Sequence, residues 1–174
     1  MKTKTLILVA ALGAGIGPAS AAAPEAPKGE SRVKVVFVNP DKFTDVKYED
    51  YEENSPALLD QIQTFLRETG EYYVPAGLHL EIKVTDITLA GRFEPWRGPD
   101  FDHVRIIRDL YPPRIELEFR LTDAQGAVVN EGKRELTDLA FQMRHPLPES
   151  DYLRYEKDML KDWFRGEFRG LKKP

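Results

Sequence analysis

The chain has 174 residues, with 25 Lys and Arg against 29 Asp and Glu, and it contains no cysteine. The absence of cysteine excludes disulfides and a lipidated cysteine, so stability must come from core packing. The acidic balance argues against non-specific binding to nucleic acid, which needs a basic footprint, and against adhesion to an anionic membrane surface. About 150 residues remain after the N-terminal segment described next, enough for one ordinary domain with a core of its own.

The N-terminus has the three parts of a secretory signal peptide. Lys2 and Lys4 precede a short apolar run over 6–12, and a Gly-Pro pair and small residues follow over 17–23. We predict a signal peptide over 1–23, cleaved after Ala21 or Ala23. The apolar run is shorter than the roughly 20 residues that a span needs, so we expect no membrane span after cleavage.

Cleavage would leave 23 basic against 29 acidic residues, a net charge of -6. Residues 24–32 are rich in Pro, Gly and Glu and predict a flexible tether, followed by a single domain over 33–170. Together these features predict a periplasmic or secreted protein.

The first half of the domain predicts a strand, a helix and a strand. Residues 33–38 are β-branched and apolar on both faces, which predicts a covered strand. Ser55-Pro56 and the helical spacing of the apolar residues that follow predict a helix over 56–69, stopped by Gly70. Alternation over 78–84 predicts a strand with one buried face. The phase slips near Asp86, where we expect a bulge that ends the ladder and redirects the chain.

The second half predicts a hairpin and a final helix. Alternation over 115–122, a turn at 123–126 and a charged partner strand over 128–136 indicate a β-hairpin whose second strand lies at an edge. Ser150 or Asp151 is expected to cap the last helix. Its apolar stripe, which we expect to be buried at Trp163 and Phe164, consists of Leu153, Met159, Leu160, Trp163, Phe164 and Phe168.

This order of elements predicts an α+β fold. We expect a two-layer sandwich, in which one mostly antiparallel sheet has helices packed on one face. The first strand-helix-strand unit favours a right-handed parallel crossover.

The irregular segment over 90–114 is long for a loop inside a compact domain, and such loops are often functional. It combines aromatic faces with guanidinium groups, the side chains that dominate binding hot spots. The candidate binding residues are Arg92, Phe93, Trp96, Arg97 and Arg105. The alternative is that Phe93 and Trp96 fold back to plug the sheet, with Arg97 and Arg105 paired to Asp100 and Asp102.

Candidate catalytic residues are weaker. Asp100, Asp102 and His103 form an Asp-x-His pattern, close to Glu94 and Asp109, that is compatible with a general base oriented by a carboxylate or with a metal. The other histidines, His79 and His145, are expected on an exposed strand face and in a loop. The sequence has no nucleophile elbow and no phosphate-binding loop, and we expect no cofactor and no metal.

Five short stretches stand out by their order and spacing: Phe43-Thr44-Asp45-Val46, Val84 to Gly91, Val104-Arg105, Tyr111-Pro112-Pro113-Arg114-Ile115 and Tyr155 to Phe164. Together they resemble a family of exported bacterial proteins that is known only as domain of unknown function 3016. The resemblance extends from about Val33 to Phe168 and implies an exported protein without implying an activity. More loosely, the order of elements is similar to that of small envelope modules that act as accessory factors.

The function expected from these observations is a non-enzymatic periplasmic binding or accessory module. Its partner would be an envelope protein or a small ligand, with no nucleic acid. The alternative is a small cell-envelope hydrolase with an Asp/His site in the 91–105 loop.

Overall fold

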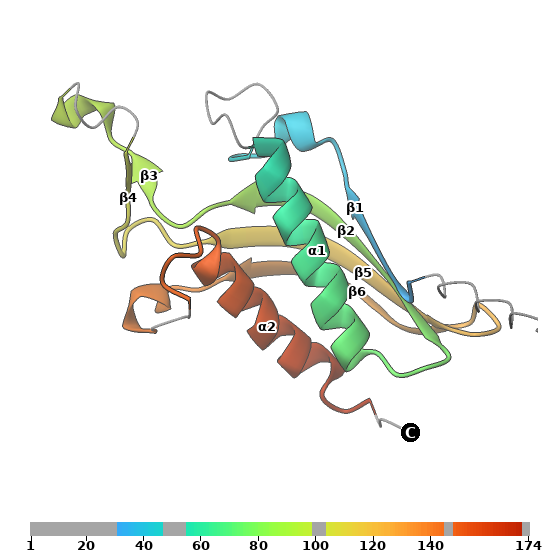
Figure 1. The fold of residues 1–174 in the computed structure, drawn as a ribbon. Helices are drawn as coiled ribbons and strands as arrows, with labels where there is room; N and C mark the ends of the chain where they lie inside the picture. Colours follow the sequence, from blue (N-terminus) through green and yellow to red (C-terminus); the bar gives the residue numbers. More distant parts are fainter. Residues whose placement is uncertain (1–30, 47–54, 99–103, 145–147, 172–174) are drawn as a thin grey trace, which may run out of the picture.

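The computed structural model describes residues 31–46, 55–98, 104–144 and 148–171. Its main sheet has the strand order β1-β2-β5-β6, and two helices cover one face of it (Figure 1). The predicted signal peptide and most of the predicted tether lie outside the described residues. The bounds of the main elements are β1 (Val33–Phe37), α1 (Ser55–Tyr73), β2 (Leu78–Thr88), β5 (Arg114–Asp123), β6 (Val128–Thr137) and α2 (Arg154–Phe168).

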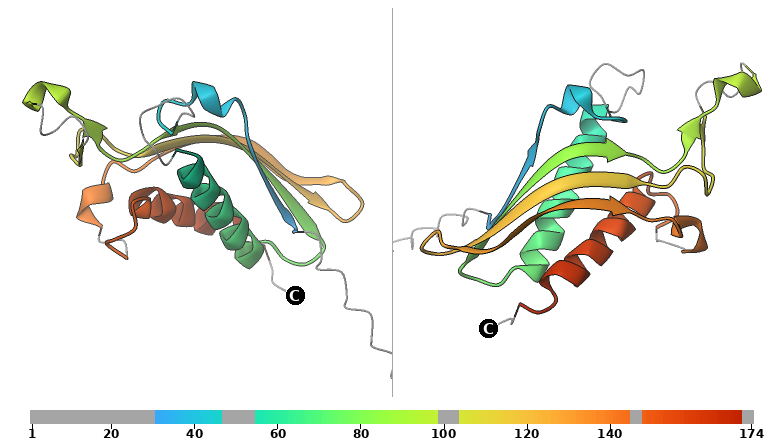
Figure 2. Two further views of the ribbon diagram at one scale, coloured as in Figure 1. Left: turned by 45° about the horizontal axis from the view of Figure 1, so that its top comes forward. Right: turned by 180° about the vertical axis from the view of Figure 1, so that it is seen from behind.

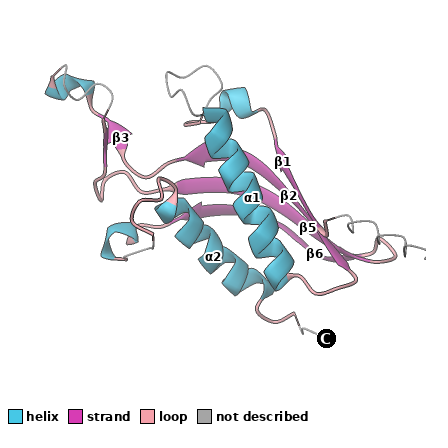
Figure 3. Ribbon diagram, viewed as in Figure 1, coloured by secondary structure: helices cyan, strands magenta, loops and turns pink. Residues whose placement is uncertain are grey.

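The predicted α+β sandwich is confirmed. β1 runs parallel to β2, as the strand-helix-strand unit requires, and the β2–β5 and β5–β6 pairs are antiparallel. Both helices lie against the same face of the sheet, and Figure 2 shows the other face uncovered by any described element. Figure 3 makes the two layers plain by colour, with the strands in one layer and both long helices in the other.

The core lies between the sheet and the helices. Alternate residues of β2 and β5 are fully buried there, among them Leu80 and Leu121, while Ile62 and Leu66 of α1 and Leu160 of α2 pack from the helical side. The side chains between them point to the open face, where carboxylates meet cations on neighbouring strands. This division follows from the two-residue period of a strand.

Trp163 and Phe164 are buried, as predicted. Trp163 is 7% exposed and lies edge-on to Phe119 of β5, at a centroid distance of 5.9 Å. Phe164 stacks on Tyr73 of α1 at 5.8 Å. The last helix therefore joins the sheet to the first helix through aromatic contacts.

Gly70 does not stop α1, which continues to Tyr73. A Cβ atom at Gly70 would lie 2.9 Å from Cγ2 of Val33, so the glycine allows the helix to approach β1 closely. In the connection from α1 to β2, the glycine with a left-handed backbone is Gly77, with φ of 84°. Gly70 is therefore needed for the close packing of α1 against β1 and does not end the helix.

β1 is an edge strand and is not covered on both faces, contrary to the prediction. Only Val33 is fully buried, and Val35, Val36 and Phe37 are half-buried. The end of the predicted tether belongs to the fold, because the Arg32 backbone and guanidinium both donate to the side chain of Glu71.

The bulge near Asp86 is confirmed, since the β2–β5 register shifts between Val84 and Asp86. Ile87 remains buried on the core face as a result. The ladder does not end there, however, because pairing resumes at Asp86 and runs to Thr88.

The prediction that Ser150 or Asp151 caps the last helix is wrong, because α2 begins at Arg154 with Leu153 at the N-cap. Asp151 instead accepts a hydrogen bond from the Leu153 backbone N–H at 2.9 Å in the turn that precedes the helix.

The segment predicted as irregular contains short elements that leave the main sheet. β3 (Arg92–Phe93) pairs antiparallel with β4 (Arg105–Ile106), and the 3-10 turn η2 (Pro95–Arg97) follows β3. Figures 1 and 2 show this unit extending beyond one end of the sheet. Its described residues, 92–98 and 104–106, are called the arm below.

Candidate functional site: a braced arm

Trp96 lies in η2, far out on the arm, with 69% of its surface exposed. The plug alternative required this side chain to be buried, and the structure contradicts it. Phe93 is half-buried, and the Arg105 guanidinium lies 5.4 Å from its ring centroid. The two aromatic residues thus differ, since Phe93 packs within the paired strands β3 and β4 and Trp96 faces solvent.

The arginines of the candidate set also differ from one another. Arg92 is exposed and forms no ion pair with another described residue. Arg97 lies on the surface with its Nε 2.7 Å from Oε2 of Glu94. Arg105 is the most enclosed, with a side chain only 7% exposed. Arg92 and Trp96 are therefore the members of the set that the arm presents outward, with Arg97 beside them.

Glu94 is a buried carboxylate inside the arm, a role that sequence reasoning did not assign to it. Arg97 and Arg108 approach its Oε2 at 2.7 and 3.3 Å, and the Tyr111 hydroxyl donates to Oε1 at 3.2 Å. Arg108 and Tyr111 lie on the part of the chain that returns from the arm to the sheet, so their contacts with Glu94 hold η2 against that segment. These contacts stabilise the segment that carries Trp96.

Arg105 joins the arm to the main sheet. Its Nε donates to the Ala90 carbonyl at 2.9 Å, and its Nη2 donates to the Leu89 carbonyl at 3.1 Å and to Oδ2 of Asp45 at 2.6 Å. The same Asp45 oxygen accepts the backbone N–H of Leu89 at 2.9 Å. Arg105 therefore braces the arm and is not an outward contact.

Glu156 of α2 reaches the junction between β2 and the arm from the helical side of the sheet. Its side chain is 1% exposed, and its Oε1 accepts the Ala90 backbone N–H at 2.7 Å. The other oxygen, Oε2, has no hydrogen-bond partner among the described residues. Burial raises the pKa of Glu156, although the Ala90 hydrogen bond and the nearby Arg105 act in the opposite direction.

Gly91 forms the bend between β2 and the arm. Its φ is 81°, and a Cβ atom there would lie 2.7 Å from the Ile106 carbonyl oxygen. Only glycine avoids both the backbone strain and the collision. Its N–H donates to the Tyr111 carbonyl at 2.9 Å, which holds the outgoing and returning chains together.

The end of the molecule that carries the arm also exposes apolar side chains elsewhere. The connection before β5 and the segment after β6 lie at this end of the sheet (Figures 1 and 2). Apart from Trp96, the sequence did not point to these side chains, because isolated apolar residues in loops give no periodic signal. The large apolar residues exposed at this end are Trp96, Val104, Leu110, Leu139, Met143 and Tyr152.

The predicted catalytic residues, Asp100, Asp102 and His103, lie outside the described residues, as does His145. His79 is exposed on the open face of β2, as expected. Among the described residues, no group of three or more His, Asp or Glu side chains could hold a metal ion. None of the described helices is long and apolar enough to cross a membrane. The hydrolase alternative stays a prediction.

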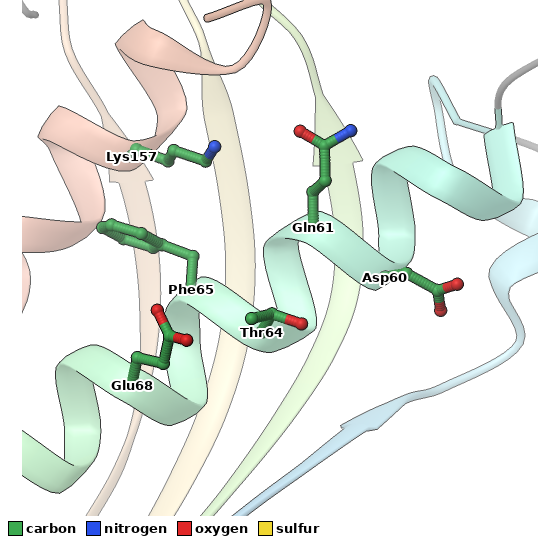
Figure 4. A pocket seen from close by; sticks show the side chains of 6 residues that line it. All are labelled: Asp60, Gln61, Thr64, Phe65, Glu68 and Lys157. Carbon is green, nitrogen blue, oxygen red and sulfur yellow. The ribbon is translucent and has the colours of Figure 1, made fainter. Parts of the chain in front are cut away.

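A shallow groove of about 310 Å³ lies between the two helices (Figure 4). Phe65 of α1 and Lys157 of α2 project into the space between the helices, and Asp60 and Glu68 lie along α1. The Lys157 amine is held by Asp151 at 2.7 Å. The groove therefore offers a partly exposed aromatic ring and carboxylates, without a nucleophile paired to a base.

A family model described as a protein of unknown function, DUF3016, matches residues 31–166. The chain belongs to this family. The sequence resemblance to DUF3016 is thereby confirmed, and the stretches that carried it supply Asp45, Ala90, Arg105 and Glu156. The DUF3016 segments thus meet at the junction that braces the arm. No curated protein and no solved structure matches the chain.

Proposed function

We propose that this DUF3016 protein is an exported, non-enzymatic binding module that docks onto a protein partner through the arm. The observation that carries the proposal is the exposure of Trp96 on a projection braced by buried polar contacts. Tryptophan and arginine supply much of the binding energy in protein interfaces. Because the brace already holds the segment that carries Trp96 in place, less conformational freedom is lost when a partner covers this side chain.

The shape of the arm favours a macromolecule over a small ligand. Sites for small molecules are concave and enclose most of the ligand surface. The arm is a projection, so its natural complement is a surface on another protein that can cover it. Of the two partner classes expected from the sequence, a protein therefore fits better.

The two edges of the sheet are poorer candidates for docking. On β6, Lys133 and Glu135 point to the open face, and Arg134 points inward to Glu167 at 2.9 Å, which are charges typical of a protected edge. On β1, the Ser31 hydroxyl bonds to the backbone of Val33. Peptide addition at either edge would have to displace these groups.

Capture experiments test the arm as the docking element. Tagged wild-type protein, Trp96→Ala and Tyr72→Ala would be incubated with the same envelope extract. Tyr72 is a matched control, since it is 65% exposed and lies in α1, away from the arm. The proposal predicts a defined set of proteins that Trp96→Ala loses and Tyr72→Ala keeps. Equal recovery by all three proteins would contradict it.

Export is supported by the charged, apolar and small-residue parts of the N-terminus, and it needs its own test. A C-terminally tagged chain should be recovered from the periplasm or the medium without residues 1–23. Deletion of residues 2–23 should retain it in the cytoplasm. An intact N-terminus in a cytoplasmic fraction would contradict the export proposal.

A further inference from the structure

A second apolar surface lies at the same end of the molecule as the arm. Leu139 lies just before the turn η4 (Phe141–Met143) and is 77% exposed, and Met143 lies in that turn and is 85% exposed. Tyr152, just before α2, is half exposed. These three side chains, together with the exposed Glu149, are called the end patch below.

The end patch is a fixed part of the fold. The Phe141 ring meets the Tyr155 ring edge-on at 4.9 Å, and this contact joins η4 to the first turn of α2. Arg144 pairs with Asp138 at 3.4 Å and with Asp158 at 3.5 Å. The apolar side chains of the patch are therefore held outward by a packed and ion-paired support.

We propose that the arm of one copy docks on the end patch of a second copy, in a closed twofold dimer. This inference rests on the proposed function and names its partner. Arm and patch occupy the same end of the sheet (Figures 1 and 2). One twofold axis beside that end can therefore place each arm on the other chain's patch, and such isologous closure is the commonest form of oligomer.

The chemistry of the two surfaces is complementary. Trp96 meets an apolar surface that includes Met143, whose flexible thioether adapts to aromatic rings. Neither Arg92 of the arm nor Glu149 of the patch forms an ion pair with another described residue. In the dimer each Arg92 reaches the Glu149 carboxylate of the other chain.

The apolar area is adequate for association. A large aromatic side chain buries about 150–250 Å². Five large side chains of the arm and the end patch, Trp96, Val104, Leu139, Met143 and Tyr152, are about half exposed or more, so they supply on the order of several hundred Å² per chain. A standard interface buries about 800 Å² of each partner. The exposed apolar side chains and the polar groups around them together supply an area of this order.

The test uses purified chain from residue 24 onward in sedimentation equilibrium up to about 100 µM, a range that covers micromolar affinity. We expect a dimer that Trp96→Ala and Leu139→Glu each weaken about 30-fold or more, the effect of a hot-spot residue. Tyr72→Ala should dimerise like the wild type. A monomer at all concentrations, or a dimer that survives Trp96→Ala, would overturn the proposal.

Because the chain lacks cysteine, pairs of introduced thiols report the contact directly. Pro95→Cys protein with a tag and untagged Met143→Cys protein would be mixed and oxidised. We expect the tagged-untagged disulfide to form faster than either like pair. Preferential Pro95→Cys homodimers would place arm against arm and overturn the proposed geometry.

Three outcomes distinguish failure of this inference from failure of the proposed function. A monomeric protein that still captures a different protein through Trp96 would overturn the dimer and leave the binding module in place. A monomer whose tryptophan emission shifts with phosphatidylglycerol vesicles would instead make a membrane surface the partner. Loss of both dimerisation and Trp96-dependent capture would remove both proposals.

Discussion

Arg105 and Asp45 are 60 residues apart in the sequence, and their side chains meet at 2.6 Å at the root of the arm. The guanidinium also donates to the carbonyls of Leu89 and Ala90, the last residues before the bend. One side chain thus connects β4, the end of β2 and the segment before α1. This contact gives the arm a defined exit direction from the sheet, which suits preorganised binding.

Replacement of Arg105 by alanine is expected to release the arm. The change removes the cation that pairs with Asp45 and the donor to two carbonyls, so we expect a loss of about 3 kcal/mol, the low end for a broken buried ion pair. Urea denaturation measures this loss, and hydrogen exchange should accelerate in the arm. Arg92→Ala, on the paired strand but exposed, is the matched control and should be nearly neutral. Unchanged exchange in the Arg105→Ala arm would contradict the bracing role.

Glu156→Gln should become progressively more stable than the wild type as the pH rises. Burial raises the pKa of Glu156 above its ordinary value of 4.5, so folding favours the protonated form. The unfolded state loses this proton first, and the folded state must then carry or expel a buried charge. The stability of the wild type therefore falls as the pH rises from the ordinary pKa through the raised one, whereas glutamine keeps the acceptor for Ala90.

Melting temperatures of both proteins between pH 4 and pH 8 measure this effect. The difference, variant minus wild type, should be smallest at acid pH and increase toward neutrality. Glu156→Ala is the control, because it removes the acceptor as well and should be destabilised throughout. A difference that is flat or decreases with pH would show that Glu156 is ionised in the folded protein without cost.

Trp163→Ala should cost about 3–5 kcal/mol, the range for a buried aromatic residue. Trp163 contacts Phe119, Phe164 and Phe168 by ring packing, so its removal opens a cavity between α2 and the sheet. Denaturant midpoints give the value. A melting temperature equal to that of the wild type would mean that α2 is not part of the cooperative core.

Periodic elements of this fold follow from the sequence, because each is encoded by its own residues. The alternation of β2 and β5 and the slip at Asp86 predict the buried faces and the bulge. Gly70 was misassigned because a glycine that permits close packing against Val33 looks, in sequence, like one that ends a helix. β1 was misassigned because apolar residues on both faces of a short strand do not reveal that it lies at an edge.

The bracing of the arm was not predictable from local pattern. Loop length and composition indicated a functional segment and selected Trp96, which is exposed. The same criteria assigned Arg105 to the binding surface with Trp96, because an arginine near aromatic residues resembles a binding hot spot. Its burial depends on Asp45, and the Ala90 contact depends on Glu156, which is 66 residues away in sequence. Such pairs are set by the tertiary fold alone.

Trp96→Ala should leave the stability of the monomer within about 0.5 kcal/mol, as for other exposed positions. Iodide should quench the emission of Trp96 in the wild type, while Trp163 stays shielded at 7% exposure. The variant should therefore keep its denaturant midpoint, measured well below the dimerisation range, and lose the quenchable component. A large loss of stability would mean that Trp96 packs against the fold.

Photo-crosslinking from position 96 in living cells shows whether the arm contacts another protein. A photoreactive phenylalanine analogue would replace Trp96 in one strain and Tyr72, an equally exposed aromatic residue, in another. We predict discrete protein adducts from position 96, including one of twice the chain's mass, that are absent from position 72. Position 96 adducts that are absent, or that match those from position 72, would contradict a binding role for the arm.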